Sequence, residues 1–180
     1  MIHLLAISGS LRVASLNSML LRALNRIAPN NVRISLYSGM GCLPLFNPDL
    51  ELSDPPAVTD LREQLTRADG VIIASPEYAH GVSGVIKNAL DWMVSNESFV
   101  NKPVMLLNAS PRATIALQSL RETLITMSAR VIDDAYVAVP ILGSKLDEDG
   151  IVNDSQISQA LLAGLNVFSR SISSLERSSL

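Results

Sequence analysis

The stretch Ser8-Gly9-Ser10-Leu11-Arg12-Val13-Ala14-Ser15-Leu16-Asn17 decides the fold of this chain. It follows an apolar run over residues 2–7, which has the composition of a strand buried on both faces. It precedes a segment, Leu16 to Ile27, in which apolar residues recur with the spacing of an amphipathic helix. The stretch is therefore predicted to join a first strand to a first helix, which is where an open α/β sheet binds ligands.

The residue types in this junction favour an anionic ligand. Backbone N–H groups at a helix start have no partner within the helix, and the helix dipole makes that end positive. Serine hydroxyls and an asparagine amide add hydrogen-bond donors, and Arg12 adds a charge that can bind two phosphate oxygens at once. An ordinary serine-rich turn with Ser15 as the helix N-cap would also explain the stretch. Both interpretations stand at this point.

Other phosphate-binding loops do not match. Gly9 alone cannot supply the three glycines of G-x-G-x-x-G, and the chain has no G-x-x-x-x-G-K-[ST]. A cysteine-based phosphatase loop would need a cysteine here, and the one cysteine is Cys42. What remains is a hydroxyl-rich loop for a terminal phosphate monoester, the kind that flavodoxin-like proteins use for FMN.

Bulk properties predict a single domain over residues 1–180. Hydrophobic residues make up 48% of the chain and charged residues 17%, which indicates a compact globular protein. The net charge of −3 without a basic cluster argues against nucleic acid, and no apolar run reaches the roughly 18 residues of a membrane span. We see no signal peptide, and a lone cysteine cannot form an internal disulfide, so we expect a cytoplasmic protein. No His, Cys, Asp or Glu spacing indicates a metal site.

The chain alternates between five predicted strands and five predicted helices. The strands are expected at 2–7, 32–36, 71–74, 104–107 and 130–139, and the helices at 16–27, 57–68, 82–93, 117–127 and after a cap at Asn153. Strict alternation implies a parallel sheet with helices on both faces. The half-polar strand 32–36 is expected at a sheet edge. Residues 147–150 are interpreted as an exposed turn, and the apolar stretch Leu43–Phe46, in a long loop, needs a cover such as a neighbouring subunit.

Polar loops follow the first, third and fourth strands, at 8–17, 75–81 and 108–114. A strand order of 2-1-3-4-5 brings these three loops together at the carboxyl edge of the sheet. The predicted fold is therefore a flavodoxin-like three-layer α/β/α sandwich around a five-stranded parallel sheet of that order.

Two motifs resemble the NAD(P)H-dependent FMN reductase family, flavodoxin-like proteins that include bacterial quinone, chromate and azo reductases. The stretch from Gly9 to Asn17 is similar to the family's G-S-x-R-x-x-S-x-N phosphate loop. The stretch from Ser75 to Trp92 is similar to its S-P-E-Y-(x5)-G-x-x-K-N-x-x-D-W signature. The order of elements matches as well, so the resemblance covers nearly the whole chain.

The resemblance implies an FMN site made by these loops. It assigns the phosphate to a first group of residues, namely Ser8, Ser10, Leu11, Arg12, Ser15, Leu16 and Asn17. It assigns the flavin ring and ribityl chain to a second group, namely Pro76, Glu77, Tyr78, His80, Gly81, Asn108 and Ser110. No protein residue is expected to be catalytic in the strict sense, because the cofactor carries the chemistry.

Several of these residues also have simpler explanations. Glu77 could be a helix-capping carboxylate and Tyr78 a core aromatic, while His80 could be a bystander in its loop. The signature's Lys87 and Asp91 could form a pair on one helix face, and its tryptophan could cover the core edge. The chain also departs from the family, most visibly at Ala79, where many relatives have Asn.

The resemblance implies an enzyme that passes a hydride from NADPH or NADH to FMN and on to quinone, flavin or another small acceptor by ping-pong. It also implies a homodimer or homotetramer. The rivals are a flavodoxin-type electron carrier without NAD(P)H oxidation and a flavin-free binding domain of the same fold. A charge of only −3 and an aromatic content of 4% favour the reductase over an acidic, aromatic-rich carrier.

Overall fold

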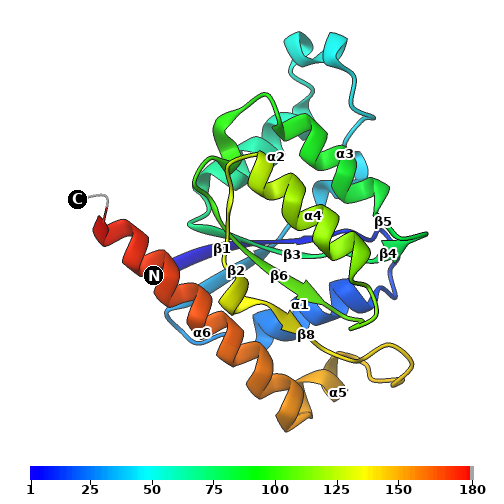
Figure 1. Cartoon of the computed structure of the whole chain (residues 1–180), viewed down its shortest axis with the longest axis vertical. Coiled ribbons are helices and arrows are strands. Elements are labelled where there is room, and N and C mark those ends of the chain that lie inside the picture. The colour runs from blue at the N-terminus through cyan, green and yellow to red at the C-terminus, as the bar shows by residue number, and fades with distance from the viewer. Residues whose placement is uncertain (179–180) are drawn as a thin grey trace.

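The computed structural model describes residues 1–178 and shows a parallel sheet between two layers of helices (Figure 1). The strands of the sheet run in the order β2-β1-β3-β6-β7, and β8 pairs with the far part of β6. Their bounds are β1 Ile2–Ser8, β2 Val32–Leu36, β3 Gly70–Ala74, β6 Pro103–Asn108, β7 Arg130–Val131 and β8 Val137–Ala138. The predicted order 2-1-3-4-5 is confirmed, with the fifth strand divided into two short pieces.

The division of the fifth strand has a local cause. Val131 lies opposite Val104, and Val137 lies opposite Leu107. Five residues therefore separate the two paired positions in the fifth strand, whereas only two separate them in β6. The surplus forms a short 3-10 turn at Asp133–Ala135, where the sequence carries two aspartates. At the opposite edge, β2 is half exposed, as expected for an edge strand, although Leu36 at its end is exposed as well. Every residue of β3 and β6 is buried.

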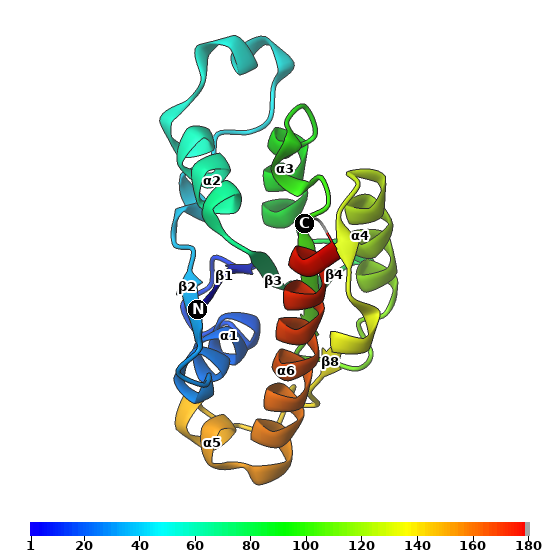
Figure 2. The same cartoon turned by 90° about the vertical axis from the view of Figure 1, so that its left-hand side faces the viewer.

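Helices cover both faces of the sheet, as Figure 2 shows. One face carries α1 (Leu16–Ile27), α5 (Glu148–Asn153) and α6 (Ser155–Ser178), and the other carries α2 (Pro56–Arg67), α3 (Gly84–Met93) and α4 (Ile115–Thr126). Successive strand residues point to opposite faces. Leu4 and Ile72 therefore belong to the core under α1 and α6, while Leu5 and Ile73 belong to the core under α2, α3 and α4.

The start of α6 differs from the prediction. Asn153 is not its cap but the last residue of α5, and the predicted exposed turn at 147–150 is the first turn of α5. Asp147 caps α5 by accepting a hydrogen bond from the Gly150 N–H at 2.8 Å. Asp154 then accepts bonds from the first backbone N–H groups of α6, at 2.9 and 3.0 Å. Two aspartate caps in succession split the predicted helix start into two helices.

The long segment between β2 and α2 leaves the body of the molecule and returns, as the upper part of Figure 2 shows. It contains two 3-10 turns, Gly39–Cys42 and Pro48–Ser53. Between them, a strap formed by Leu43–Phe46 lies against α3. The following residues, 47–55, form an arm that projects from the domain.

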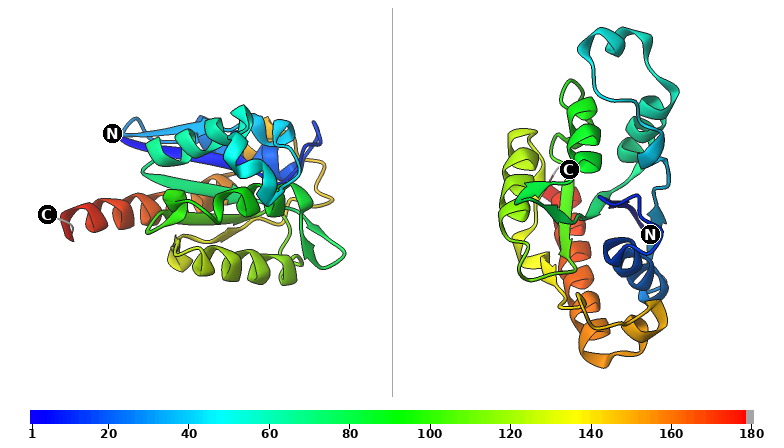
Figure 3. Two further views of the ribbon diagram at one scale, coloured as in Figure 1. Left: turned by 90° about the horizontal axis from the view of Figure 1, so that it is seen from above. Right: turned by 90° about the vertical axis from the view of Figure 1, so that its right-hand side faces the viewer.

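The carboxyl ends of the strands lie at the end of the molecule that also carries a small antiparallel hairpin, β4 (Glu77–Tyr78) and β5 (Gly81–Val82). Figure 3 shows this hairpin at the opposite end from the N-terminus and from the end of α6. The three polar loops therefore gather at one end of the sheet, as the strand order requires.

Candidate functional site

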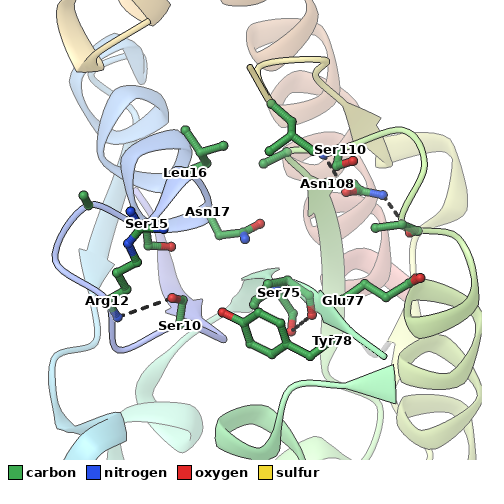
Figure 4. A pocket seen from close by; sticks show the side chains of 15 residues that line it. Ser10, Arg12, Ser15, Leu16, Asn17, Ser75, Glu77, Tyr78, Asn108 and Ser110 are labelled. Atoms are coloured by element: carbon green, nitrogen blue, oxygen red, sulfur yellow. Dashed lines mark hydrogen bonds between the residues drawn. The ribbon is translucent and has the colours of Figure 1, made fainter. Parts of the chain in front are cut away.

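The loops after β1, β3 and β6 border one cavity of about 270 Å³, shown in Figure 4. A fourth contribution comes from the segment after β8. The lining residues are Ser10, Arg12, Ala14, Ser15, Leu16, Asn17, Ser75, Pro76, Glu77, Tyr78, Asn108, Ala109, Ser110, Ala113 and Leu142. A volume close to 300 Å³ is at the lower end of the range for small-molecule and cofactor sites.

The first loop is shaped by its own hydroxyl groups. Ser15 caps α1, because its Oγ accepts a hydrogen bond from the Ser18 N–H at 3.3 Å. Ser10 Oγ accepts from the Arg12 N–H at 3.3 Å, which folds the loop back over the helix start (Figure 4). The capping interpretation of Ser15 is thus right, and the same geometry places backbone N–H groups and hydroxyls around the cavity.

Two side chains of this loop are left for a ligand. The Arg12 guanidinium forms no hydrogen bond or ion pair with any other group in residues 1–178, and Arg12 borders the cavity. Asn17 is 7% exposed, yet its buried Oδ1 has no hydrogen-bond partner within the same residues. An unpaired buried amide oxygen is costly. FMN fits this set: its phosphate suits Arg12 and the N–H groups, and its ribityl hydroxyls can donate to Asn17.

Gly9 is what allows the first two loops to share a cavity. A Cβ at Gly9 would lie 2.4 Å from Ser75 Oγ and 2.8 Å from Ile86 Cγ1, so no larger residue fits there. The Gly9 N–H also donates to the Ala74 carbonyl at 2.8 Å, at the end of β3. The phosphate loop is thereby fixed against the start of the second loop.

The second loop presents an aromatic side chain at the cavity. Tyr78 is 60% exposed, and Figure 4 shows its ring projecting from the hairpin toward the first loop. The interpretation of Tyr78 as a core aromatic is therefore wrong. An exposed ring beside Pro76 offers a planar apolar surface on which a flavin or nicotinamide can stack.

Glu77 behaves differently from Tyr78. Its side chain is 13% exposed, and its Oε2 accepts a hydrogen bond from the Ala116 N–H at 2.9 Å in the first turn of α4. The residue before α4, Thr114, makes no side-chain cap. The helix-capping interpretation of Glu77 is therefore right for its carboxylate, which ties the hairpin to α4, while the residue still borders the cavity.

The tip of the hairpin is a turn with two residues in left-handed conformations, Ala79 at φ 49° and His80 at φ 61°. This is the pattern of a type I′ turn, which normally holds Asn or Gly. His80 Nδ1 lies 3.1 Å from Glu77 Oε1, and its side chain is exposed. Neither His80 nor Gly81 borders the cavity, and a Cβ at Gly81 would make only ordinary contact with the Tyr78 carbonyl oxygen, at 3.4 Å.

The third loop is organised by Asn108, whose side chain is buried. Its Oδ1 accepts from the Ser110 N–H at 2.9 Å, and its Nδ2 donates to the Ala113 carbonyl at 3.0 Å. Asn108 therefore holds the curve of this loop, and Ser110 and Ala113 complete the cavity wall (Figure 4).

Two other predicted residues lie apart from this cavity. Ser8 turns toward α1, where its Oγ lies 2.7 Å from Ser18 Oγ, and Leu11 faces the other side of the loop. Five residues border the cavity without belonging to the predicted site, namely Ala14, Ser75, Ala109, Ala113 and Leu142. The Ser75 signal was already present in the second motif, whereas no sequence pattern marks Leu142.

The second half of the signature holds the strap instead of a ligand. Asn88 donates to the Pro44 carbonyl at 3.0 Å and accepts from the Phe46 N–H at 2.8 Å. The Trp92 indole N–H donates to the same carbonyl at 2.8 Å, and the rings of Phe46 and Trp92 meet edge-on with centroids 5.2 Å apart. Lys87 pairs with Asp91 along the helix. The simple explanations of these residues are confirmed.

Two further observations bear on chemistry. Within residues 1–178, no three His, Cys, Asp or Glu side chains lie close enough together to hold a metal ion. In the same part of the chain, no helix combines the length and apolar character needed to cross a bilayer.

Comparison with known proteins identifies the family of the chain. A family model described as NADPH-dependent FMN reductase matches residues 2–142. The chain is 34% identical to an NAD(P)H-dependent FMN reductase of Pseudomonas aeruginosa over 166 residues, which cover 89% of each protein. It is 30% identical to a quinone reductase of Escherichia coli over 175 residues, covering 93% of each.

Solved structures agree as well. FerB, a flavoenzyme NAD(P)H:(acceptor) oxidoreductase from Paracoccus denitrificans, superposes with a TM-score of 0.86 at 27% identity. That match covers 97% of this chain and 98% of FerB. The chain therefore belongs to the NADPH-dependent FMN reductase family and is an NAD(P)H-dependent oxidoreductase that uses FMN.

Proposed function

We propose that the cavity between the three loops binds FMN and that the enzyme reduces quinones or other small acceptors there. One observation carries this proposal: the cavity has free polar groups at one end and an exposed aromatic ring at the other. Near the start of α1, the Arg12 guanidinium and Asn17 Oδ1 have no partner within residues 1–178, and Tyr78 faces them across the cavity (Figure 4). A phosphate with an attached flat ring system has this distribution of groups.

At the phosphate end, Arg12 supplies charge and the N–H groups at the start of α1 supply directed donors. The hydroxyls of Ser10 and Ser15 complete the set, while Asn17 accepts from the ribityl chain. Ser8 and Leu11 contribute through the backbone of the loop. These residues bind and orient the cofactor but take no part in the redox step.

At the ring end, Pro76 and Tyr78 align the isoalloxazine, and the loop held by Asn108 closes the other side with Ser110. Glu77 acts as a positioning residue, because its carboxylate fixes the hairpin to α4. His80 and Gly81 shape the hairpin from outside the cavity wall. When bound, FMN supplies the hydride-transfer chemistry, and the protein supplies alignment and exclusion of water.

Nicotinamide and acceptor use the same face in turn, which gives ping-pong kinetics. Tyr78 is largely exposed at the cavity, so a planar molecule can reach a ring bound beside it. The names of the relatives support a quinone or a flavin as the acceptor. We propose that either NADPH or NADH donates the hydride.

We also infer that the protein is a homodimer or homotetramer. Leu45 in the strap is 84% exposed and Leu52 in the arm is 99% exposed, and apolar side chains this accessible suit a contact between subunits. Residues 1–180 form a single domain in this proposal. The lone cysteine, Cys42, and the net charge of −3 support a cytoplasmic protein that binds neither nucleic acid nor membrane.

The test is a visible spectrum of the purified protein after addition of FMN and desalting, followed by anaerobic addition of NADPH or NADH. We expect a retained flavin band that bleaches promptly and returns when a quinone is added. A band that neither nicotinamide bleaches would support the electron-carrier alternative instead. Loss of all flavin on desalting, with no turnover of added FMN, would overturn the proposed site.

A further inference from the structure

A second cavity, of about 350 Å³, lies on the other side of the phosphate loop. It is bounded by the ends of β1 and β2, the loop itself and the flank of α1, which Figure 2 shows beside β2. Its lining consists of Ala6, Ser8, Ser10, Leu11, Arg12, Val13, Ser18, Leu21, Arg22, Leu36, Tyr37, Ser38 and Met40. None of these residues comes from the loops after β3 and β6, so the cavity is separate from the surface proposed for the flavin ring.

The charged residues that line the second cavity are both arginines, Arg12 and Arg22. No aspartate or glutamate borders it. Arg22 Nε donates to Glu148 Oε2 at 2.8 Å, a bond that leaves the two terminal nitrogens of its guanidinium for another partner. The Arg12 guanidinium has no partner among residues 1–178. An anion placed between the two arginines would meet the free charge of Arg12 and the terminal N–H donors of Arg22, whose charge is shared with Glu148.

The rest of the wall is apolar or carries hydroxyl groups. Leu21 and Met40 are buried side chains at the wall, while Leu11 and Leu36 are partly open to solvent. The hydroxyls of Ser8 and Ser18 lie 2.7 Å apart and satisfy each other. An apolar wall with two cations is suited to a ligand that has a ring-sized apolar body and one acidic group.

We propose that this second cavity binds a small organic anion, with a carboxylate or phosphate held by Arg12 and Arg22 and an apolar body against Leu21, Leu36 and Met40. The ligand is not an electron acceptor, because the cavity has no residue in common with the hairpin loop. Its effect on the enzyme passes through the phosphate loop, which is the wall between the two cavities.

Ser10 and Arg12 border both cavities. If the FMN phosphate takes Arg12 as proposed above, the anion and the cofactor compete for one guanidinium. Occupancy of the second cavity then weakens FMN binding, and FMN weakens anion binding by the same factor, because coupling between two sites is reciprocal. The second cavity is thus a regulatory site that acts on cofactor affinity.

The first test measures anion binding to the enzyme with and without bound FMN by calorimetry, with naphthoate and naphthyl phosphate as probes. We expect Arg22→Met to weaken binding about tenfold, the size of one lost charge-assisted hydrogen bond. Arg26→Met is the matched control, because Arg26 also pairs with Glu148, one turn further along α1, but does not border the cavity. The probe that binds more tightly identifies the acidic group. Equal affinities for the wild type, Arg22→Met and Arg26→Met would overturn the proposal.

Leu36→Glu provides a second variant that does not depend on Arg22. Leu36 lies at the partly exposed end of the edge strand β2, so a carboxylate is tolerated there while it repels an anion in the cavity. Binding of both probes should fall in this variant as well. Full binding in Leu36→Glu would place the probe elsewhere.

The coupling is tested by titrating FMN into the apoprotein with and without saturating probe. The apparent Kd for FMN should rise several-fold with the probe in the wild type and should not change in Arg22→Met. An unchanged Kd in the wild type would overturn the coupling. Failure of the proposed FMN site looks different: Arg12→Ala would then leave FMN affinity intact, while probe binding would still depend on Arg22.

Discussion

The phosphate loop at residues 8–17 and the helix segment at residues 87–92 both match the family's sequence pattern, but they do different work. In the loop, Arg12 and Asn17 border a cavity with polar groups that have no partner among residues 1–178. In the helix segment, the side chains of Asn88 and Trp92 form hydrogen bonds with the backbone of the strap. One motif leaves polar groups free at a cavity and the other ties the strap to α3, so a matching motif does not by itself locate a ligand.

The largest effect on this comparison should come from Trp92→Ala. The side chain is 1% exposed, and truncating a buried tryptophan costs about 3–5 kcal/mol of unfolding free energy. We expect Tm, followed by circular dichroism, to fall by about 10 °C or more. The FMN affinity of the folded variant should stay close to wild type. A fall in the FMN affinity of Trp92→Ala with an unchanged Tm would show that the helix segment contributes to ligand binding.

Arg12→Ala should show the opposite pattern. Loss of a charge-assisted contact should weaken FMN binding by about 1.5–3 kcal/mol, or roughly 10- to 150-fold, in a fluorescence titration. The Tm of the apoprotein should not change, because Arg12 is exposed and unpaired. Arg33→Ala, on the exposed face of β2, is the matched control and should leave the titration unaltered.

Glu77→Ala sharpens the comparison, because Glu77 borders the cavity and also caps α4. We expect a loss of about 1 kcal/mol in stability, the usual value of a helix cap, and faster hydrogen exchange at the Ala116 amide. Glu77→Gln keeps an acceptor for that amide and should restore most of its protection. Normal exchange in Glu77→Ala would show that the carboxylate does not cap the helix.

The smallest effect is expected at the hairpin tip. Ala79 has a φ of 49°, and the left-handed region costs a residue with an ordinary side chain roughly 1 kcal/mol or more. Asn tolerates this conformation better, so Ala79→Asn should raise the free energy of unfolding by about 0.5 kcal/mol in urea titration. Ala79→Val, which is worse in this region, should lower it. An increase for both variants would contradict the assigned turn.

Much of the fold follows from sequence patterns, and so does the loop that carries the unpaired groups. The run at residues 2–7, the spacing from Leu16 to Ile27 and the polar loops after three strands led to the observed strand order, since each signal is local. The start of the final helix did not follow, because local sequence does not show that a separate helix, α5, precedes it. Asp147 and Asp154 both act as caps, and α5 between them packs against α1.

The parts that were missed depend on contacts between distant residues. The partner of Trp92 is a backbone carbonyl 48 residues away, and backbone groups leave no trace in a sequence pattern. Leu142 reaches the cavity from a segment without periodicity. Ala79 and His80 form the hairpin turn although neither is a usual turn residue, so the hairpin had no sequence signal.

The ion pairs between α1 and α5 have a consequence for how the chain is made. Arg22 and Glu148 are 126 positions apart in the sequence. At synthesis rates of about 5–20 residues per second, Glu148 is made roughly ten seconds after Arg22. During this time the flank of α1 that α5 and α6 later cover remains without its partners. Nascent chains should therefore recruit chaperones while the intervening residues are translated, and refolding of the full chain should be slow because this closure is non-local.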